Sequence, residues 1–408
     1  MKRKWLAVGI ILLFVETSLI PVIAQDAEKL LPSSRGNWLY VGGSGPGNYT
    51  WIQDAINASS DGDTVFVYDD SSPYFENLVI NKSIVVLGEG RNSTVVDGGK
   101  NRDVVLISAD NVYIEGFTIQ HSGNWSGHCG FKINTSNNIT ISNNNIVENI
   151  YGISLDYSNN CAIKDNTFCR NQEVSNEIYL CSNTIISGNT IVESEVGLIG
   201  ILLQSSTSNT ISQNIIEHNQ VGVALRSSDN STIYNNIIRF NDVSGIEMRG
   251  GANNSIVENI IQSNNYNGII VAESIYNTTV QDNVIDGQLY GIYLTVSHSK
   301  GISISFNTLT NNSYGIELFD SSLITISCNN FIKNDCNAYF KLLPFEKNLW
   351  SGNYWDDHSR IGSKVILGRV LLFSIEFPAL YLYFEFRIPW VNFDWHPAQE
   401  PYDISGMS

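Results

Sequence analysis

The sequence predicts an all-β solenoid, a stack of short coils in which each coil packs only against its neighbours. An aliphatic residue recurs every 22 to 25 residues, at Ile141, Ile163, Ile186, Ile211, Ile233, Ile256, Val280, Ile304 and Ile326. The residue three positions later is always asparagine, at Asn144, Asn166, Asn189, Asn214, Asn236, Asn259, Asn283, Asn307 and Asn329. Most repeats then close with a short apolar segment such as "GISL", "GVAL" or "GIEL". Self-similarity at such a period is the signature of a repeat architecture.

Each coil is predicted to contain three short strands joined by tight corners, with aliphatic side chains inside and Thr or Ser side chains outside. Asparagine suits the corners because it tolerates left-handed backbone angles and bonds to nearby main chain. Stacked strands lie about 4.8 Å apart, so we expect the asparagines to form a structural ladder, not a ligand site. A second amide column, with Ser194 and Gln288 as exceptions, follows at Asn149, Asn171, Asn219, Asn241, Asn264, Asn312 and Asn334.

Both ends of the predicted stack, which should have about ten to twelve coils, need a cover because open strand edges invite further pairing. The segment "YTWIQDAINAS" places Trp51, Ile52, Ala55 and Ile56 on one helical face, which predicts a lid on the first coil. The apolar segment 365–386 is expected to form a hairpin that caps the last coil. A patch that docks on a membrane or a partner is the alternative.

The first residues carry a basic start, an apolar run and small residues before position 25, which predicts a signal peptide over 1–24 and a linker over 25–37. An uncleaved membrane anchor is the alternative. The rest is expected to divide into an N-terminal cap with the first coils (38–105), the main repeats (106–346) and a C-terminal tail (347–408).

The composition limits the partners. Forty acidic and 23 basic side chains give a net charge of −17, which opposes binding to nucleic acid or anionic lipid. Cations, neutral glycans and basic surfaces stay open as partners. Six cysteines without a CxxC pair predict disulfides or inert buried thiols in an exported chain. About eleven Asn-x-Ser/Thr sequons are consistent with a surface glycoprotein.

Family resemblance agrees with the repeat. The stretch from "YVGGSGPGNYTWIQDAINAS" to "NKSIVVLGEG" resembles the opening of right-handed parallel β-helix proteins of the pectinesterase and pectate lyase architecture. "GFTI" (Gly116–Ile119), the asparagine columns and "NLWSGNYWDD" are similar to the NosD-type periplasmic copper-binding family, especially its exported archaeal members. The resemblance covers nearly all of 38–404 and implies a right-handed parallel β-helix. For activity it implies at most an accessory role in copper-enzyme maturation.

The sequence predicts no catalytic residues, no metal site and no cofactor. Residues seven positions after the recurring aliphatic residue include Glu148, Arg170 and His218, but no two carboxylates are adjacent there, and we find no paired carboxylates on one outer face. The six histidines never fall on adjacent equivalent positions, which disfavours copper. The glycine-rich stretch at Gly42–Gly47 lacks the lysine of a phosphate-binding loop and is interpreted as a turn.

One outward-facing strip is a candidate carbohydrate-binding site. Arg226 and Arg249 are expected on neighbouring coils with Glu247 beside them, flanked at a distance by Tyr179 and Tyr293. Such a strip could hold a sugar acid or an extended glycan by forked hydrogen bonds and ring stacking. A surface ion pair among scattered aromatic residues is the alternative.

The sequence therefore favours an extracytoplasmic, secreted or cell-surface protein with a structural or recognition role. Its expected partners are extracellular polysaccharides or envelope proteins and not nucleic acid. Membrane contact is expected only through an uncleaved anchor or the segment 365–386. Two other functions stay open, a polysaccharide-active lyase or hydrolase and an accessory factor in copper-enzyme maturation.

Overall fold

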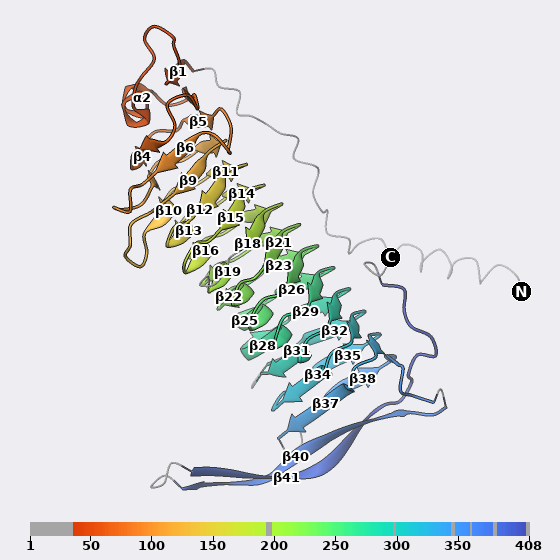
Figure 1. The fold of residues 1–408 in the computed structure, drawn as a ribbon. Helices are drawn as coiled ribbons and strands as arrows, with labels where there is room; N and C mark the ends of the chain where they lie inside the picture. Colours follow the sequence, from red (N-terminus) through yellow and green to blue (C-terminus); the bar gives the residue numbers. More distant parts are fainter. Residues whose placement is uncertain are drawn as a thin grey trace, which may run out of the picture. The chain divides into compact units, whose positions relative to one another are not determined.

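The computed structural model describes residues 36–192, 198–296, 299–343, 347–359, 361–377 and 382–404. The predicted signal peptide and nearly all of the predicted linker lie outside these residues. The chain from Gly36 onward is one compact unit, an all-β solenoid whose strands stack in chain order (Figure 1). No helix in the described ranges is both long and apolar enough to cross a membrane.

Three columns of parallel strands build the solenoid, and each coil contributes one strand to each column. Column I is β4 (Leu78–Ile80), β7 (Val105–Ile107), β10 (Cys129–Asn134), β13 (Tyr151–Asp156), β16 (Val174–Tyr179), β19 (Ile199–Gln204), β22 (Val221–Arg226), β25 (Ser244–Ala252), β28 (Asn267–Tyr276), β31 (Tyr290–Thr295), β34 (Tyr314–Phe319), β37 (Cys336–Leu342) and β40 (Lys364–Phe377).

Column II is β1 (Trp38–Val41), β2 (Thr64–Val67), β5 (Val85–Gly88), β8 (Tyr113–Glu115), β11 (Thr140–Ser142), β14 (Ala162–Lys164), β17 (Ile185–Ser187), β20 (Thr210–Ser212), β23 (Thr232–Tyr234), β26 (Ser255–Val257), β29 (Thr279–Gln281), β32 (Ile302–Ser305), β35 (Ile324–Ser327), β38 (Leu349–Ser351) and β41 (Leu382–Asp394).

Column III is a separate sheet of thirteen described strands. They are β3 (Tyr74–Phe75), β6 (Val95–Asp97), β9 (Thr118–Gln120), β12 (Asn145–Val147), β15 (Thr167–Cys169), β18 (Thr190–Val192), β21 (Ile215–Glu217), β24 (Ile237–Arg239), β27 (Ile260–Gln262), β30 (Val284–Asp286), β33 (Thr308–Thr310), β36 (Asn330–Ile332) and β39 (Tyr354–Trp355). The stack therefore has about thirteen turns, slightly more than the ten to twelve expected, because the turns outside the asparagine repeat were undercounted.

The core is a stack of aliphatic side chains, as the repeat predicts. The central residue of each three-residue strand points inward, so that Ile141, Ile163 and Ile186 register with one another and are fully buried. One coil alone buries too few side chains to offset the entropy of ordering its backbone. Stability therefore depends on contact between neighbouring coils.

The recurring asparagines form a continuous hydrogen-bonded ladder inside one corner of the coils. The side-chain amide of Asn214 donates to Oδ1 of Asn236 at 2.9 Å and to the carbonyl of Ile186 on the preceding coil at 2.9 Å. The same pattern repeats from Asn144 to Asn329 and continues to Asn353. A second ladder includes Gln288, whose side-chain oxygen accepts from the backbone N–H of Asn264 on the preceding coil.

The sequence had suggested that the ladder asparagines adopt left-handed backbone angles, but in the structure they do not. These angles fall on the residue before each one, for example Asn143 (φ 52°), Asp165 (φ 55°) and Asn235 (φ 53°). The ladder side chains are buried, whereas the left-handed residue makes the corner and carries its own side chain outward. Corner and ladder are thus separate requirements at adjacent positions.

Both ends of the solenoid are covered. Helix α2 (Ile52–Ala58) buries Ile52, Ala55 and Ile56 over the first strands. At the other end β40 pairs in parallel with β37 and then forms a long antiparallel hairpin with β41 (Figure 1). The residues 378–381 of the predicted apolar hairpin lie outside the described ranges. Asp394 of β41 is fully buried and ends the first ladder, accepting from the amide of Asn353 at 3.0 Å.

Candidate functional site

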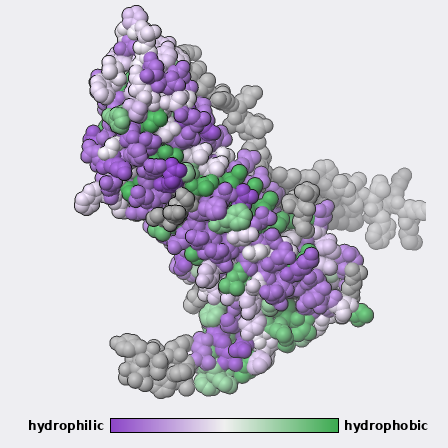
Figure 2. Space-filling view, viewed as in Figure 1, coloured by the Kyte–Doolittle hydropathy of each residue, from purple (hydrophilic) through white to green (hydrophobic). Residues whose placement is uncertain are grey.

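The outer side of column I carries two parallel rows of side chains that register strand by strand. The first row is Lys132, Ser154, Glu177, Leu202, Ala224, Glu247, Ile270, Tyr293, Glu317 and Tyr339. The second row includes Asn134, Asp156, Tyr179, Gln204, Arg226, Arg249, Ala272 and Thr295, with Phe319 and Lys341 further along. Figure 2 shows one face of the molecule, on which hydrophilic residues predominate between apolar patches.

The structure places the predicted binding strip on these rows. Arg226 and Arg249 are direct partners on β22 and β25, and both are exposed. Glu247 lies two residues before Arg249 on the same strand and accepts from its Nε at 2.5 Å. This hydrogen bond raises the pKa of Arg249. Arg249 is therefore neutralised locally, whereas Arg226 has no such carboxylate on its own strand.

Tyr179 and Tyr293 belong to different rows, so they do not flank the arginines symmetrically. Tyr179 lies in the second row, two strands before Arg226. Tyr293 lies in the first row, two strands after Glu247. In the sequence, the segment "EIYL" (177–180) was aligned with "GISL" (152–155) of the preceding coil. That alignment would place the Cys181 side chain on the outer face. In the structure Cys181 is buried, and Glu177 takes the outward position in its place.

Tyr293 is part of a larger tyrosine platform, which we define as Tyr290, Tyr293, Tyr314 and Tyr339. The rings of Tyr290 and Tyr314 stack with centroids 5.3 Å apart, and Tyr293 lies 5.2 Å from Tyr290. Glu317 lies among these rings almost fully buried and accepts from Lys341 Nζ at 2.9 Å. Three successive strands thus present a surface of phenol rings around an ion pair.

A second polar group on the same face, the carboxylate cluster, consists of Lys132, Ser154, Asp156 and Glu177. Lys132 Nζ lies 2.5 Å from Oδ2 of Asp156 and 3.0 Å from the Ser154 hydroxyl. The Ser154 hydroxyl lies 3.5 Å from Oδ1 of Asp156 and 3.4 Å from Oε2 of Glu177. This arrangement corrects the expectation that no paired carboxylates share an outer face.

The two carboxylates have different surroundings. Burial raises the pKa of Glu177, the charge of Asp156 raises it further, and Lys132 opposes the rise only in part. Burial lowers the pKa of Lys132, but its hydrogen bond to Asp156 and the charges of Asp156 and Glu177 act together against that effect, and the net shift is upward. Burial and a hydrogen bond to Glu173 also raise the pKa of the neighbouring Tyr151 phenol.

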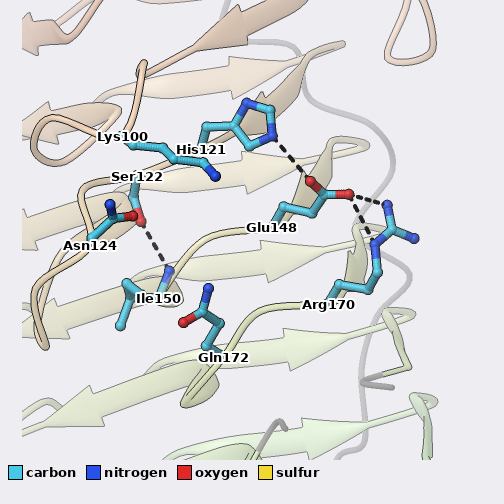
Figure 3. Close-up of a pocket in the computed structure, with 8 residues that line it drawn as sticks. All are labelled: Lys100, His121, Ser122, Asn124, Glu148, Ile150, Arg170 and Gln172. Carbon is cyan, nitrogen blue, oxygen red and sulfur yellow. Dashed lines mark hydrogen bonds and ion pairs between the residues drawn. The ribbon is translucent and has the colours of Figure 1, made fainter. Parts of the chain in front are cut away.

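A pocket of about 130 Å³ lies beside this face, where column III turns into column I (Figure 3). Its lining residues are Lys100, His121, Ser122, Asn124, Glu148, Ile150, Arg170 and Gln172. His121 bridges two carboxylates, with Nδ1 2.8 Å from Asp97 and Nε2 3.1 Å from Glu148. Glu148 is also paired with Arg170 at 2.6 Å. Figure 3 shows Glu148 between His121 and Arg170 at the rim.

The charges of this pocket compensate one another. The hydrogen bond from Arg170, followed by that from His121, lowers the pKa of Glu148. Burial raises the pKa of Asp97, but hydrogen bonds from Gln120, the Gly99 backbone and His121 outweigh burial and lower it overall. The charged groups of this pocket are thus paired with one another, and we assign the pocket no chemistry.

The donor set does not fit a copper site. Within the described residues, no three His, Cys, Asp or Glu side chains are close enough to hold a metal ion. None of the six cysteines, all of which the structure describes, is in a disulfide, so of the two expectations the disulfides are wrong. Burial raises the pKa of Cys161 to about 11 and that of Cys181 to about 12, which disfavours the thiolate form that binds metal. One of the six histidines, His298, lies outside the described residues.

Sequence reasoning missed Asp156 and Glu177 as neighbours because it shifted one coil by two residues. The column glycine lies 11 or 12 positions after the recurring aliphatic residue in most repeats, for example Gly152 after Ile141 and Gly245 after Ile233. Applied to Ile163, this spacing points to Ser175 as the glycine equivalent. That register would have placed Glu177 outward beside Ser154.

Comparison with known proteins agrees with the fold. Residues 56–244 match the family model described as "Periplasmic copper-binding protein (NosD)", and residues 181–331 match "Right handed beta helix region". The "Probable pectinesterase/pectinesterase inhibitor 6" of Arabidopsis thaliana is 28% identical over 150 residues, which are 32% of this chain and 27% of the relative. The chain thus spans about a quarter of the curated relative it matches.

Several solved structures share the architecture at low identity, which shows the fold alone. The A-module of mannuronan C-5 epimerase AlgE4 from Azotobacter vinelandii has a TM-score of 0.58 at 16% identity, covering 74% of this chain and 95% of that one. The catalytic domain of a GH87 alpha-1,3-glucanase has a TM-score of 0.61 at 13% identity, covering 83% and 69%. The surface adhesin PfbA of Streptococcus pneumoniae has a TM-score of 0.53 at 13% identity, covering 86% and 95%.

The two family models together cover residues 56–331, and they coincide with the coils described above. These matches support a NosD-like, right-handed parallel β-helix family for the chain.

Proposed function

We propose that this protein is an extracytoplasmic glycan-recognition protein that binds an extended polysaccharide along the outer face of column I. The observation that carries the proposal is the tyrosine platform, where stacked rings on three adjacent strands surround the Glu317–Lys341 pair. Rigid aromatic faces beside a few fixed polar groups are the usual lining of small-molecule sites. Five strand intervals of about 4.8 Å separate Tyr179 from Tyr293, so the face could hold an oligosaccharide and not only one sugar.

The charges of the face favour a neutral glycan. Within the two rows four cations, Lys132, Arg226, Arg249 and Lys341, stand against four carboxylates, Asp156, Glu177, Glu247 and Glu317. The chain as a whole carries a net charge of −17. A polyanion such as pectate or alginate would therefore meet repulsion without a compensating basic groove.

The location outside the cytoplasm is part of the proposal. It is supported by the signal-like first residues, which the structure does not describe, and by the periplasmic character of the matching family. The fold relatives named after mannuronan, alpha-1,3-glucan and pectin substrates are consistent with a glycan partner. No copper function is proposed, because the donor set does not fit one.

Retention of the mature chain on immobilised polysaccharides tests the proposal. The panel contains neutral glycans (starch, dextran, laminarin, mannan and xylan) and acidic ones (pectate and alginate). We expect retention on at least one neutral glycan and at least a tenfold loss of affinity, about 1.4 kcal/mol, in Tyr293→Ala and in Arg226→Ala/Arg249→Ala. Arg239→Ala is the matched control, because Arg239 lies on column III and pairs with Glu217. Absence of retention on every glycan would refute the proposal.

A further inference from the structure

The carboxylate cluster has the composition of a hydrolytic site. The Ser154 hydroxyl lies within 3.5 Å of Asp156 Oδ1 and 3.4 Å of Glu177 Oε2, so these oxygens are at most about 7 Å apart. Enzymes that hydrolyse glycosidic bonds hold their two carboxyl groups about 5 to 9.5 Å apart, on either side of the scissile bond. The separation of Asp156 and Glu177, which lie on the adjacent strands β13 and β16, stays below the upper limit of this range.

The two carboxyl groups are also differentiated as such a reaction needs. Lys132 pairs with Oδ2 of Asp156 and also donates to the Ser154 hydroxyl, so its charge offsets the negative charge of the Asp156 carboxylate. Burial and the charge of Asp156 favour the protonated form of Glu177 by raising its pKa. A carboxyl group whose surroundings favour its protonated form can act as the acid of such a pair.

Aromatic rings lie next to the pair. Tyr179 is the strand partner of Asp156, and Tyr157 follows Asp156 in the chain. Their rings pack edge to face with centroids 5.7 Å apart, and Tyr157 is 53% exposed. A sugar ring can lie against such a surface with its glycosidic oxygen over the carboxylates. The same second row leads through Gln204 to Arg226, so one glycan chain can reach both the rings and the proposed binding face.

We infer that the carboxylate cluster hydrolyses glycosidic bonds of a neutral polysaccharide, with Glu177 as general acid and Asp156 as the opposing carboxylate. Glu177 donates its proton to the glycosidic oxygen, and the bond from that oxygen to the anomeric carbon breaks with its electron pair on the oxygen. Asp156 stabilises the positive charge that develops at the anomeric carbon. A water molecule then bonds to that carbon and returns a proton to Glu177, so one water is consumed for each bond cleaved.

The inference rests on the proposed glycan binding and is tested with the same panel. Release of new reducing ends is measured on the full mature chain for every glycan that retains it, together with absorbance of unsaturated sugars. The variants are Glu177→Gln and Asp156→Asn. Glu217→Gln is the matched control, since Glu217 lies on column III and pairs with Arg239 outside the proposed face. Retention is measured for each variant, which separates loss of catalysis from loss of folding or binding.

We expect the wild type and Glu217→Gln to release reducing ends from at least one neutral glycan. Glu177→Gln and Asp156→Asn should lower the rate at least a hundredfold with retention unchanged, because a positioned general acid contributes about 10² to 10⁴ in rate. Retention without release by the wild type would overturn the inference and leave the binding proposal standing. Undiminished release by Glu177→Gln, or unsaturated products, would also overturn it. If the wild-type chain is retained on no glycan, both the binding proposal and the hydrolysis inference are refuted.

Discussion

Asn176 is expected to destabilise the protein. It lies on β16 at an inward position, in register with Ile153 and Ile201. The residue is fully buried, and neither Oδ1 nor Nδ2 of its amide has a hydrogen-bond partner. A buried polar group without a partner costs about 1 to 3 kcal/mol, and Asn176 has two such groups. Leucine has nearly the same size and would add buried apolar surface worth about 1.5 to 3 kcal/mol. We therefore expect Asn176→Leu to raise the free energy of unfolding by at least about 2 kcal/mol.

Asn189 provides the matched comparison, because it is an equally buried asparagine in the ladder. Its amide donates to Ile163 O at 2.9 Å and to Asn214 Oδ1 at 3.0 Å, and its Oδ1 accepts from Asn166. Asn189→Leu leaves these partners unsatisfied and should lower the free energy of unfolding by about 3 kcal/mol or more. The same substitution thus has opposite signs at two buried asparagines.

Urea denaturation followed by circular dichroism measures both variants. Native-state hydrogen exchange on β13 and β19 is measured in parallel, because coils of a repeat protein can open locally. If Asn176→Leu destabilises the protein as much as Asn189→Leu does, then the Asn176 amide is hydrogen-bonded in solution and the reasoning is refuted.

Three further predictions concern packing, pH and the end of the ladder. A Cβ added at Gly222 would lie 2.6 Å from the carbonyl oxygen of Gly245. Gly222→Ala should therefore lower the free energy of unfolding, measured by urea titration, by about 1 to 3 kcal/mol. An unchanged urea midpoint would contradict this close approach. The pKa of Glu177 is raised in the folded state, so the wild type should lose stability as pH rises through that pKa. Melting temperatures measured from pH 4 to pH 8 should show that Glu177→Gln lacks this loss. The same pH dependence in the wild type and the variant would refute the assignment. Asp394→Asn replaces one of two acceptor oxygens with a donor, so either the donors of Asn353 or those of Gly352 and His396 lose their acceptor, and hydrogen exchange in β38 and β39 should be faster; unchanged exchange would show that the ladder needs no anionic end.

The fold could be predicted almost completely because the same sequence repeat specifies each coil of the stack. The inward aliphatic residues, the ladder asparagines and the lid helix all follow from periodicity and residue type, and one misjudged repeat does not change the architecture. Periodicity could not identify the individual residues that end the ladder. Asn353 and Asp394 end the ladder from a tail without repeats, and their pairing across 41 residues has no pattern in sequence.

The site was predicted less well because it depends on register. Arg226, Glu247 and Arg249 were placed together, since their coils have the regular spacing. Glu177 was missed because a two-residue shift in one coil moves every side chain to a different row. The tyrosine platform was reduced to Tyr293, because Tyr290 and Tyr314 are the first residues of their strands and lie outside the alternating pattern used to find outward positions.

The carboxylate cluster lies in the coil where column I departs from its own repeat. In β16 Ser175 replaces the usual glycine, and Asn176 replaces the inward aliphatic residue. The adjacent outward position carries Glu177, whose partial burial costs stability at neutral pH. A coil that served only to extend the stack would be more stable with glycine and isoleucine here, as in β19. Local rules that are broken together in one coil are expected where a ligand or a reaction determines the residues. The departure in β16 is therefore an argument for function that is independent of the distances within the cluster.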